Sequence, residues 1–290
     1  MPGVTTSTKY VAGPNGPVRV RRYRPAGPVR SALVWLHGGA FIAGDLDMPE
    51  ADWVARRLAS DAVGVISVDY RLAVGGVHFP VPGDDVLAVW RWATSTDVFT
   101  LGEEPGIGWH VGGASAGGNL AASLAMQARD HGDRPPRSCV LAYPVLHDAM
   151  PEPSPDLARR LAGIDEAQRF RPDRCRQLNL NYVGDPANLT HPYAFPAHGD
   201  ATGLPPTLIV TSDLDDLRPS GQAYAAQLAQ AGVDVALLCE AGVTHGHLDA
   251  PDCAGARHTM SRILTWLRLV DANRSVAQIS GSGWHDPCPR

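Results

Sequence analysis

The chain has 290 residues, enough for one large α/β domain or two small ones, and such a chain buries roughly three-quarters of the surface that it exposes unfolded. Its hydrophobic fraction of 44% is ordinary for a water-soluble domain, and its formal charge of −5 without a basic run argues against nucleic acid as a partner. No stretch approaches about 18 uninterrupted apolar residues, so we expect no membrane span.

The cysteines and the N-terminus indicate the compartment. Five cysteines are widely spaced, and no pair has the spacing of zinc ligands. Cys139 and Cys239 lie in apolar, strand-like runs and are expected to be buried thiols. Residues 1–13 lack the basic start and apolar run of a secretory signal. We therefore expect a cytoplasmic protein with reduced thiols.

Taken in chain order, strand-like and helix-like segments alternate. The predicted strands are Val18–Tyr23, Ser31–Leu36, Val63–Val68, Ile107–Gly112, Ser138–Ala142, Thr207–Thr211 and Asp234–Glu240. The predicted helices are Ala51–Ser60, a helix that Asp84 and Asp85 open, Leu120–Arg129, Ser220–Ala231 and Cys253–Val270. This alternation predicts an α/β fold with a mainly parallel, doubly wound sheet and helices on both faces. Such sheets carry their sites at the carboxyl ends of the strands.

Two of these elements carry finer predictions. Val18–Tyr23 alternates Val and Arg, which suits an edge strand. Asp47, Pro49 and Glu50 are typical of a helix start, as the cap, the first helical residue and the acid three positions after the cap.

One segment interrupts the alternation. Residues 148–203 contain many prolines, several arginines, a helical stretch and no clear buried strand. We interpret them as a cap over the strand ends, within a single domain of residues 1–270. A disordered loop is the alternative, against which the Leu, Phe and Tyr residues of the segment argue. Residues 271–290 are polar and contain Gly and Pro, so we expect a loose tail.

A glycine-rich motif between a strand and a helix carries the first candidate for chemistry. Residues 113–119 read Gly-Ala-Ser-Ala-Gly-Gly-Asn. On a sharp strand-to-helix turn, Ser115 would stand clear of the sheet, and Gly113 and Gly117 would allow close approach of neighbouring backbone. The N–H of Ala116 would point toward charge that develops beside Ser115. A simple glycine-rich loop is the alternative.

A second glycine pair follows the strand that ends at Leu36. In His37-Gly38-Gly39-Ala40, two successive glycines leave backbone N–H groups open to a ligand, as an oxyanion hole requires. A plain strand-to-helix turn is the alternative, and it is less favoured beside a nucleophile motif.

A serine nucleophile needs a histidine base and an acid that holds the base. Among 11 histidines, His245 is best placed, on a loop after the last strand, with His247 as its rival. Three carboxylates follow the preceding strand, Asp213, Asp215 and Asp216, and the residues alone do not choose among them. The chain order Ser, Asp, His is the order of α/β-hydrolases.

Together these motifs resemble the hormone-sensitive-lipase-like carboxylesterases of the α/β-hydrolase fold. They are His37-Gly38-Gly39-Ala40, residues 113–120, Asp215-Asp216-Leu217-Arg218 and His245-Gly246, and the likeness runs from about residue 31 to residue 270. The family usually writes Asp-Pro-Leu and His-Gly-Phe, so the resemblance selects Asp215 and His245, with Asp216 where the Pro would be and His247 where the Phe would be. It assigns the oxyanion hole to Gly38, Gly39 and Ala116.

The resemblance implies hydrolysis of small carboxylic esters without a metal or cofactor. It leaves the oligomeric state open, and a homodimer would be unsurprising for the family. An amide or formamide hydrolase with the same triad and a catalytically inactive binding protein of the same fold are the alternatives.

Three departures from the family pattern bear on substrate range more than on reaction type. Ala40 replaces the usual third glycine, and the N-terminal arm is short. Where relatives continue Asp-Tyr-Arg-Leu-Ala with Pro-Glu, this chain has Val74-Gly75-Gly76, so the local support of the site is expected to differ.

Overall fold

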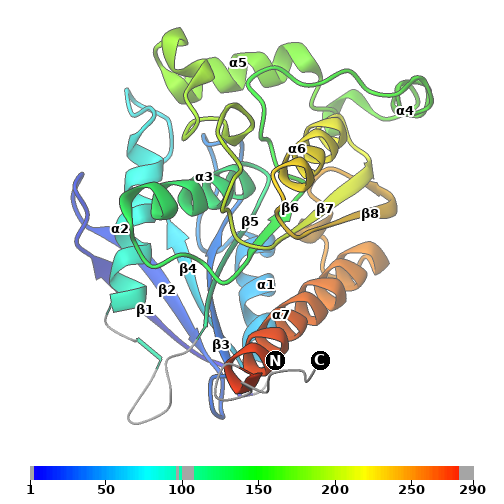
Figure 1. Ribbon diagram of the computed structural model, residues 1–290. Coiled ribbons are helices and arrows are strands. Elements are labelled where there is room, and N and C mark those ends of the chain that lie inside the picture. The colour runs from blue at the N-terminus through cyan, green and yellow to red at the C-terminus, as the bar shows by residue number, and fades with distance from the viewer. Residues whose placement is uncertain (1–2, 96–97, 100–107, 281–290) are drawn as a thin grey trace, which may run out of the picture.

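A single mixed sheet runs through the middle of the molecule (Figure 1). The computed structural model describes residues 3–95, 98–99 and 108–280. The strands are β1 (Thr5–Val11), β2 (Val18–Arg24), β3 (Ser31–Leu36), β4 (Val63–Asp69), β5 (Trp109–Ala114), β6 (Cys139–Ala142), β7 (Thr207–Leu214) and β8 (Val235–Thr244). Across the sheet they lie in the order β1-β2-β4-β3-β5-β6-β7-β8. Only the pairs β1–β2 and β2–β4 are antiparallel, which confirms the predicted fold class.

Helices cover both faces of the sheet (Figure 1). They are α1 (Pro49–Ala59), α2 (Val81–Ser95), α3 (Ala116–His131), α4 (Pro155–Leu161), α5 (Pro172–Val183), α6 (Arg218–Gln230) and α7 (Ala254–Ser280). Short 3₁₀ turns are η1 (Glu166–Gln168), η2 (Pro186–Thr190), η3 (Pro196–His198) and η4 (His247–Asp249).

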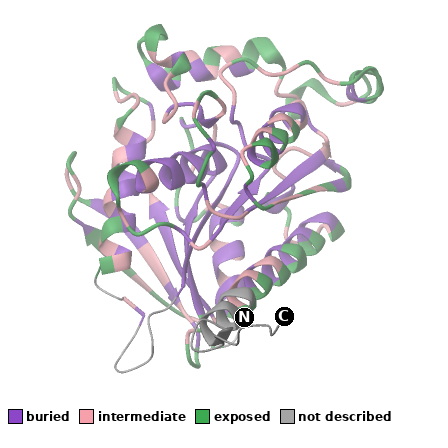
Figure 2. Ribbon diagram, in the orientation of Figure 1, coloured by how far each residue is buried: buried purple, intermediate pink, exposed green. Residues whose placement is uncertain are grey.

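The sheet separates two hydrophobic cores. In β3, Val34 and Leu36 point into the core shared with α2, α3 and α6, while Leu33 and Trp35 point into the core shared with α1 and α7. Because both faces are covered, β3 is buried along its whole length, as its continuous apolar sequence predicts. Buried residues fill the central strands in Figure 2.

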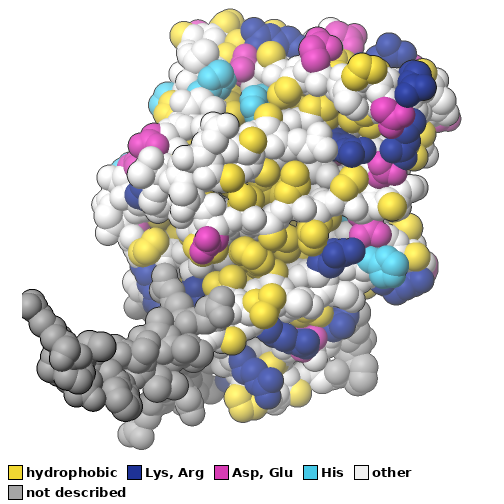
Figure 3. Space-filling model, turned by 45° about the vertical axis from the view of Figure 1, so that its right-hand side comes forward, with side chains coloured by type: hydrophobic (Ala, Val, Ile, Leu, Met, Phe, Trp, Pro, Cys, Tyr) yellow, Lys and Arg dark blue, Asp and Glu magenta, His cyan; other side chains and the backbone are white. Residues whose placement is uncertain are grey.

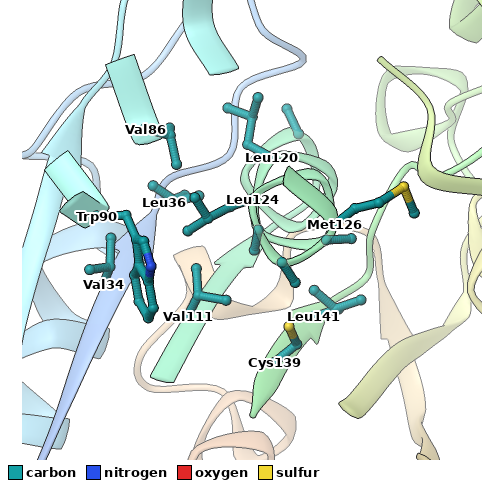
Figure 4. Close-up of a cluster of buried hydrophobic side chains, with 14 of the residues drawn as sticks. Val34, Leu36, Val86, Trp90, Val111, Leu120, Leu124, Met126, Cys139 and Leu141 are labelled. Atoms are coloured by element: carbon teal, nitrogen blue, oxygen red, sulfur yellow. The ribbon is translucent and has the colours of Figure 1, made fainter. Parts of the chain in front are cut away.

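Figure 4 shows the first of these cores. Leu120 and Leu124 of α3 lie over the strands, beside Val111 of β5, and Trp90 of α2 closes one side. This packing holds the helix that begins directly after Ser115 against the sheet.

The prediction that residues 18–23 form an edge strand is wrong. β1 pairs with β2 on its outer side, and Val20 and Tyr23 of β2 are fully buried. The sequence signal for β1 was weak because an edge strand with a solvated face is composed largely of Thr, Ser and Lys.

The opposite edge is β8, and here Cys239 is exposed rather than buried as predicted. Leu237, Cys239 and Ala241 alternate along β8 and are all exposed, so the face of the strand that carries them is in contact with solvent. Leu237 of β8 and Leu269 of α7 are also exposed, and hydrophobic side chains gather on the face that carries these two elements (Figure 3).

Two helices begin differently from their predicted starts. The cap of α1 is Met48, not Asp47, and Glu50 makes no capping contact with it. The second predicted helix, α2, begins at Val81, three residues before Asp84. Its Asp85 does not start the helix but accepts hydrogen bonds from the backbone and guanidinium of Arg71.

Several strands extend closer to the site than predicted. β7 continues to Leu214 and β8 to Thr244, so that Asp215 and His245 follow their strands directly. β5 begins at Trp109, and the predicted strand residue Ile107 lies outside the described residues.

Residues 148–203 contain α4, α5 and three 3₁₀ turns, and no strand is found among them. In Figure 1, α4 and α5 lie together beyond one end of the sheet. Two arginines of this segment reach the end of β7 and the turn that follows it: Arg160 pairs with Asp213, and Arg169 pairs with Asp216. The segment therefore covers the carboxyl end of that strand.

The C-terminal helix is longer than predicted. α7 continues to Ser280, so residues 271–280 are helical and not a loose tail, and residues 281–290 lie outside the described part. Asp271 accepts a hydrogen bond from Arg137 at 2.7 Å and lies 3.3 Å from the imidazole of the buried His110. These contacts extend the packing of α7 past Val270.

Among residues 3–95, 98–99 and 108–280, no helix is long and apolar enough to cross a membrane. The same residues contain no group of three His, Cys, Asp or Glu side chains that could hold a metal ion.

We predict that Asp271→Ala lowers the free energy of unfolding by about 1–3 kcal/mol, because it leaves the Arg137 guanidinium and His110 without this partner. Urea denaturation at pH 7 measures the change. The control Arg159→Ala removes an ion pair whose side chains are 78% and 67% exposed, and should stay within about 0.5 kcal/mol of wild type. Equal stability of Asp271→Ala and wild type would contradict the anchoring role.

Candidate active site

Ser115 occupies a sharp turn between β5 and α3. Its φ of 54° and ψ of −113° lie in a region that non-glycine residues rarely adopt, as the predicted nucleophile turn requires. The approach of α3 to the sheet explains Gly117, because a Cβ there would lie 2.0 Å from the carbonyl oxygen of Leu36. The turn therefore brings the hydroxyl of Ser115 to the sheet end with the helix N-terminus directly behind it.

His245 lies between Ser115 and Asp215. Its Nδ1 is 2.8 Å from Oδ2 of Asp215, and its Nε2 is 3.0 Å from Oγ of Ser115. Because a carboxylate only accepts hydrogen bonds, Nδ1 donates to Asp215 and Nε2 accepts from the serine hydroxyl. The side chains of His245 and Asp215 are 7% and 1% exposed, so little water competes with these bonds.

The three aspartates at the end of β7 and just after it have different partners. Asp213 pairs with Arg160 and Arg218 and accepts a hydrogen bond from the backbone of Gly242. Asp216 pairs with Arg169. Asp215 alone among them contacts His245, and its second oxygen accepts a hydrogen bond from the backbone N–H of Leu217.

The rival histidine has a packing role. Nδ1 of His247 lies 2.9 Å from Oγ of Ser212, and its Nε2 lies 2.8 Å from Oγ1 of Thr259. Burial, and secondarily the nearby His245, lower the pKa of His247 to about 4, so it stays neutral near pH 7. With both ring nitrogens occupied, His247 links the loop to α7.

The loop His37-Gly38-Gly39-Ala40, which we call the oxyanion loop, was predicted to offer the N–H groups of Gly38 and Gly39 to a ligand. The structure differs from this prediction at Gly38. The N–H of Gly38 donates a hydrogen bond of 2.9 Å to the buried carboxyl of Glu50. Gly38 is therefore not an open donor, which contradicts its predicted role. Among the described residues, none accepts a hydrogen bond from the N–H of Gly39, Ala40 or Ala116.

The chain turns sharply after Gly38. Gly39 has a φ of 113°, and a Cβ at this position would lie 2.0 Å from the carbonyl oxygen of Ala43. Ala40 and Phe41 follow with φ of 53° and 64°, so the loop holds two non-glycine residues in the left-handed region. Ala40 lines the cavity beside Ser115.

Glu50 is the main support under this loop, a role that its sequence position after Pro49 did not reveal. Its carboxyl group accepts hydrogen bonds from Gly38 and from Nε1 of Trp35, the latter at 2.5 Å. Its side chain is 1% exposed. Burial, with a smaller contribution from the charge of Asp249, raises the pKa of Glu50 to about 8, against the lowering effect of its two donors. The group therefore keeps its proton to a higher pH than an exposed Glu does.

His37 and the segment after β4 complete the support. The ring of His37 stacks on Tyr70 with centroids 4.3 Å apart, and the Tyr70 hydroxyl donates to the carbonyl of His37. Ala73 precedes the segment that lacks the family's Glu, and its carbonyl accepts from Asn181 of α5 while its N–H donates to Phe41. A cap residue thus contributes to local support here.

A small apolar cavity lies against Ser115. Its volume is about 20 Å³, room for about one water molecule. The lining residues are Ala40, Phe41, Ser115, Val145, Phe170, Cys175, Leu178, Asn179 and Leu217. Phe170, Cys175, Leu178 and Asn179 come from the segment 148–203, so the cap forms one wall. Sequence reasoning could not identify these residues, because nothing in the pattern shows which side of the cap faces Ser115.

Comparison with known proteins shows what the chain is similar to. Residues 33–249 match the family profile described as α/β-hydrolase fold. The chain is 37% identical to an ethyl acetate hydrolase of Pseudomonas putida over 240 residues, covering 78% of this chain and 70% of that protein. It is 34% identical to the carboxylic ester hydrolase LipN of Mycobacterium tuberculosis over 264 residues, covering 86% and 67%. A solved esterase of Pyrobaculum calidifontis superposes with a TM-score of 0.81 at 30% identity, covering 93% and 85%.

The raised pKa of Glu50 predicts a pH-dependent stability. Between about pH 4.5 and pH 8 the folded protein keeps a proton that the unfolded chain releases, so the contribution of Glu50 to stability declines as pH rises through this window. The slope contributed by one such proton is at most about 1.4 kcal/mol per pH unit. Urea denaturation from pH 5 to pH 8.5 measures it.

Glu50→Gln is the matched variant, since it keeps the shape of the side chain and cannot titrate. We expect the variant to be less stable than wild type at pH 5, because the single amide oxygen cannot accept hydrogen bonds from both Trp35 and Gly38 as the two carboxyl oxygens do. We also expect its free energy of unfolding to change less with pH. The same slope in both proteins would show that Glu50 does not titrate in this window.

Proposed function

Since the chain belongs to the hormone-sensitive-lipase-like carboxylesterases of the α/β-hydrolase fold and is a hydrolase acting on carboxylic esters, we propose that it hydrolyses small esters through an acyl-enzyme on Ser115. His245 is the general base, and Asp215 is the acid that holds it. No cofactor takes part in this scheme.

In the first half of the reaction, Oγ of Ser115 attacks the ester carbonyl carbon while Nε2 of His245 takes the serine proton. Asp215 keeps the imidazole in the tautomer with Nδ1 protonated and stabilises the imidazolium that forms. The carbon–oxygen bond to the alcohol then breaks, and His245 gives its proton to the departing alcohol. The acyl group remains on Ser115.

Negative charge that develops on the carbonyl oxygen needs preorganised donors. We assign these to the N–H groups of Gly39, Ala40 and Ala116. The hydrogen bond from Gly38 to Glu50 supports this assignment, because it removes the predicted donor and holds the loop from below. Ala40, which stands where the family usually has Gly, takes over a position in the hole.

In the second half, His245 takes a proton from water, and the resulting hydroxide attacks the acyl carbon. The bond between that carbon and Oγ of Ser115 breaks, and the serine recovers its proton from His245. A carboxylic acid leaves, and the site returns to its starting protonation state.

The observation that carries this proposal is the pair of hydrogen bonds at His245, with Ser115 on one ring nitrogen and Asp215 on the other. If His245 served only as the partner of Asp215, its second ring nitrogen would not need to contact Ser115.

Ser115→Ala should lower kcat on p-nitrophenyl acetate by about 10⁴-fold or more, because the acyl-enzyme cannot form. Wild type and variant are compared by initial rates after matched purification, with circular dichroism as the control for folding. Turnover by the variant at the wild-type rate would remove the nucleophile assignment.

Asp215→Asn should lower kcat by about 10⁴-fold, because an amide can stabilise the wrong tautomer of His245 and cannot stabilise the imidazolium. Asp213→Asn is the matched control at the same strand end, since Asp213 contacts arginines and not His245. It should keep kcat within about tenfold of wild type. Equal losses in the two variants would argue against the specific role of Asp215.

The leaving group is not determined by the triad. Initial rates on p-nitrophenyl acetate and p-nitroacetanilide compare an ester and an amide with the same acyl group. Faster turnover of the anilide would favour the amide hydrolase alternative.

The compartment and the assembly are further proposals. The free thiols of Cys139, Cys175, Cys239 and Cys253 support a reducing, cytoplasmic location. A homodimer is proposed from the family resemblance, and analytical ultracentrifugation tests it.

A further inference from the structure

Asp216 stands where related esterases usually have Pro, and it holds the cap. Its carboxylate accepts hydrogen bonds from Nε and Nη2 of Arg169 at 2.7 and 2.8 Å and from the backbone N–H of Phe170 at 2.9 Å. The side chains of Arg169 and Asp216 are only 12% and 6% exposed. Bidentate geometry with so little solvent makes this a stronger contact than an ordinary surface ion pair.

The residue that this contact holds is a wall of the active-site cavity. Phe170 lines the cavity together with Ser115, and its ring centroid lies 4.5 Å from that of His245. Its backbone is held at both ends, since its N–H donates to Asp216 and its carbonyl accepts from the thiol of Cys175 at 3.0 Å. The Phe170 backbone therefore cannot move away from Ser115 unless one of these contacts breaks.

We propose that Asp216 is a positioning residue that sets the size of the ester by holding Phe170 over Ser115. The proposal rests on the proposed esterase function and names the feature of this chain that limits its substrates. Phe170 narrows the space beside Ser115, where the cavity has a volume of about 20 Å³. A longer acyl or alkyl group on that side requires Phe170 to move, and movement of its backbone opposes the buried ion pair between Asp216 and Arg169.

The position of Asp216 couples this wall to the catalytic groups. Asp215 binds His245, and the next residue binds the segment that places Phe170 against the same imidazole. The turn after β7 thus holds His245 through Asp215 and Phe170 through Asp216.

A second ion pair, between the cap and the end of β7, supplies a control. Arg160 of α4 donates to both oxygens of Asp213. These side chains are 40% and 13% exposed, and neither residue lines the cavity. Loss of this pair loosens the cap without releasing Phe170.

The experiment measures kcat/KM for p-nitrophenyl acetate and p-nitrophenyl hexanoate, and for ethyl acetate and hexyl acetate, in wild type, Asp216→Asn and Arg169→Met. For each pair of esters we take the ratio of kcat/KM for the longer ester to kcat/KM for the shorter one. We expect this ratio to be about tenfold or more higher in Asp216→Asn and Arg169→Met than in wild type for at least one pair, which is the discrimination expected of one or two methylenes in a pocket. Each ratio is independent of the fraction of folded enzyme, so a loss of stability does not imitate the effect.

Three controls separate positioning from other roles. Arg160→Met should keep both ratios within about twofold of wild type. Phe170→Ala should raise the ratio in the same series, and adding Asp216→Asn to it should change the ratio no further, because Asp216 acts through Phe170. The pH profile for the acetate should be the same in Asp216→Asn and wild type, since Asp215 and His245 are unchanged.

Unchanged chain-length ratios in both Asp216→Asn and Arg169→Met, in an enzyme that hydrolyses the acetates, would overturn the positioning role and leave the esterase proposal intact. An equal rise in Arg160→Met would also overturn it, because any loosening of the cap would then suffice. No hydrolysis of any ester by the wild type would instead contradict the proposed function itself.

Discussion

The strained turn at Ser115 is the constraint on which the rest of the site depends. A φ of 54° is unfavourable for serine, and it is maintained by the N–H of Ser115 donating to Ala142 and by the close approach of Gly117 to Leu36. Because the hydroxyl direction follows from this backbone, His245 can meet it at 3.0 Å while its other nitrogen meets a carboxylate. The packing of α3 on the sheet thus determines the direction of the Ser115 hydroxyl.

Glu50 connects the other two parts of the site. Its carboxyl group supports the oxyanion loop through Gly38, and its backbone N–H donates to Asp249, four residues after His245. The raised pKa of Glu50 suits this place, because a negative charge under the loop would oppose the negative charge that the proposed reaction develops on the substrate oxygen. The loop and the histidine are therefore braced by one residue that takes no part in the chemistry.

Much of this could be predicted from the sequence, because strand ends and glycine turns leave local signals. Those signals singled out Ser115 and favoured His245 over His247. The residues alone did not choose among the three aspartates, because they do not show which of them the arginines of the cap bind. Glu50 carried the pattern of a helix start and proved to be a buried support. Residue types alone do not identify a site: Ser138, His110 and Asp271 also form a hydrogen-bonded chain, yet Ser138 and His110 are fully buried and join α7 to the sheet.

The most direct test of the account is covalent labelling of Ser115. Diethyl p-nitrophenyl phosphate should add one diethylphosphoryl group per chain, with release of one p-nitrophenolate. Peptide mass spectrometry should locate the group on Ser115, and His245→Ala should slow labelling by about 10²-fold or more, the usual contribution of a general base. Labelling at another residue, or at an equal rate without His245, would contradict the central claim that the turn and the imidazole together make Ser115 a nucleophile.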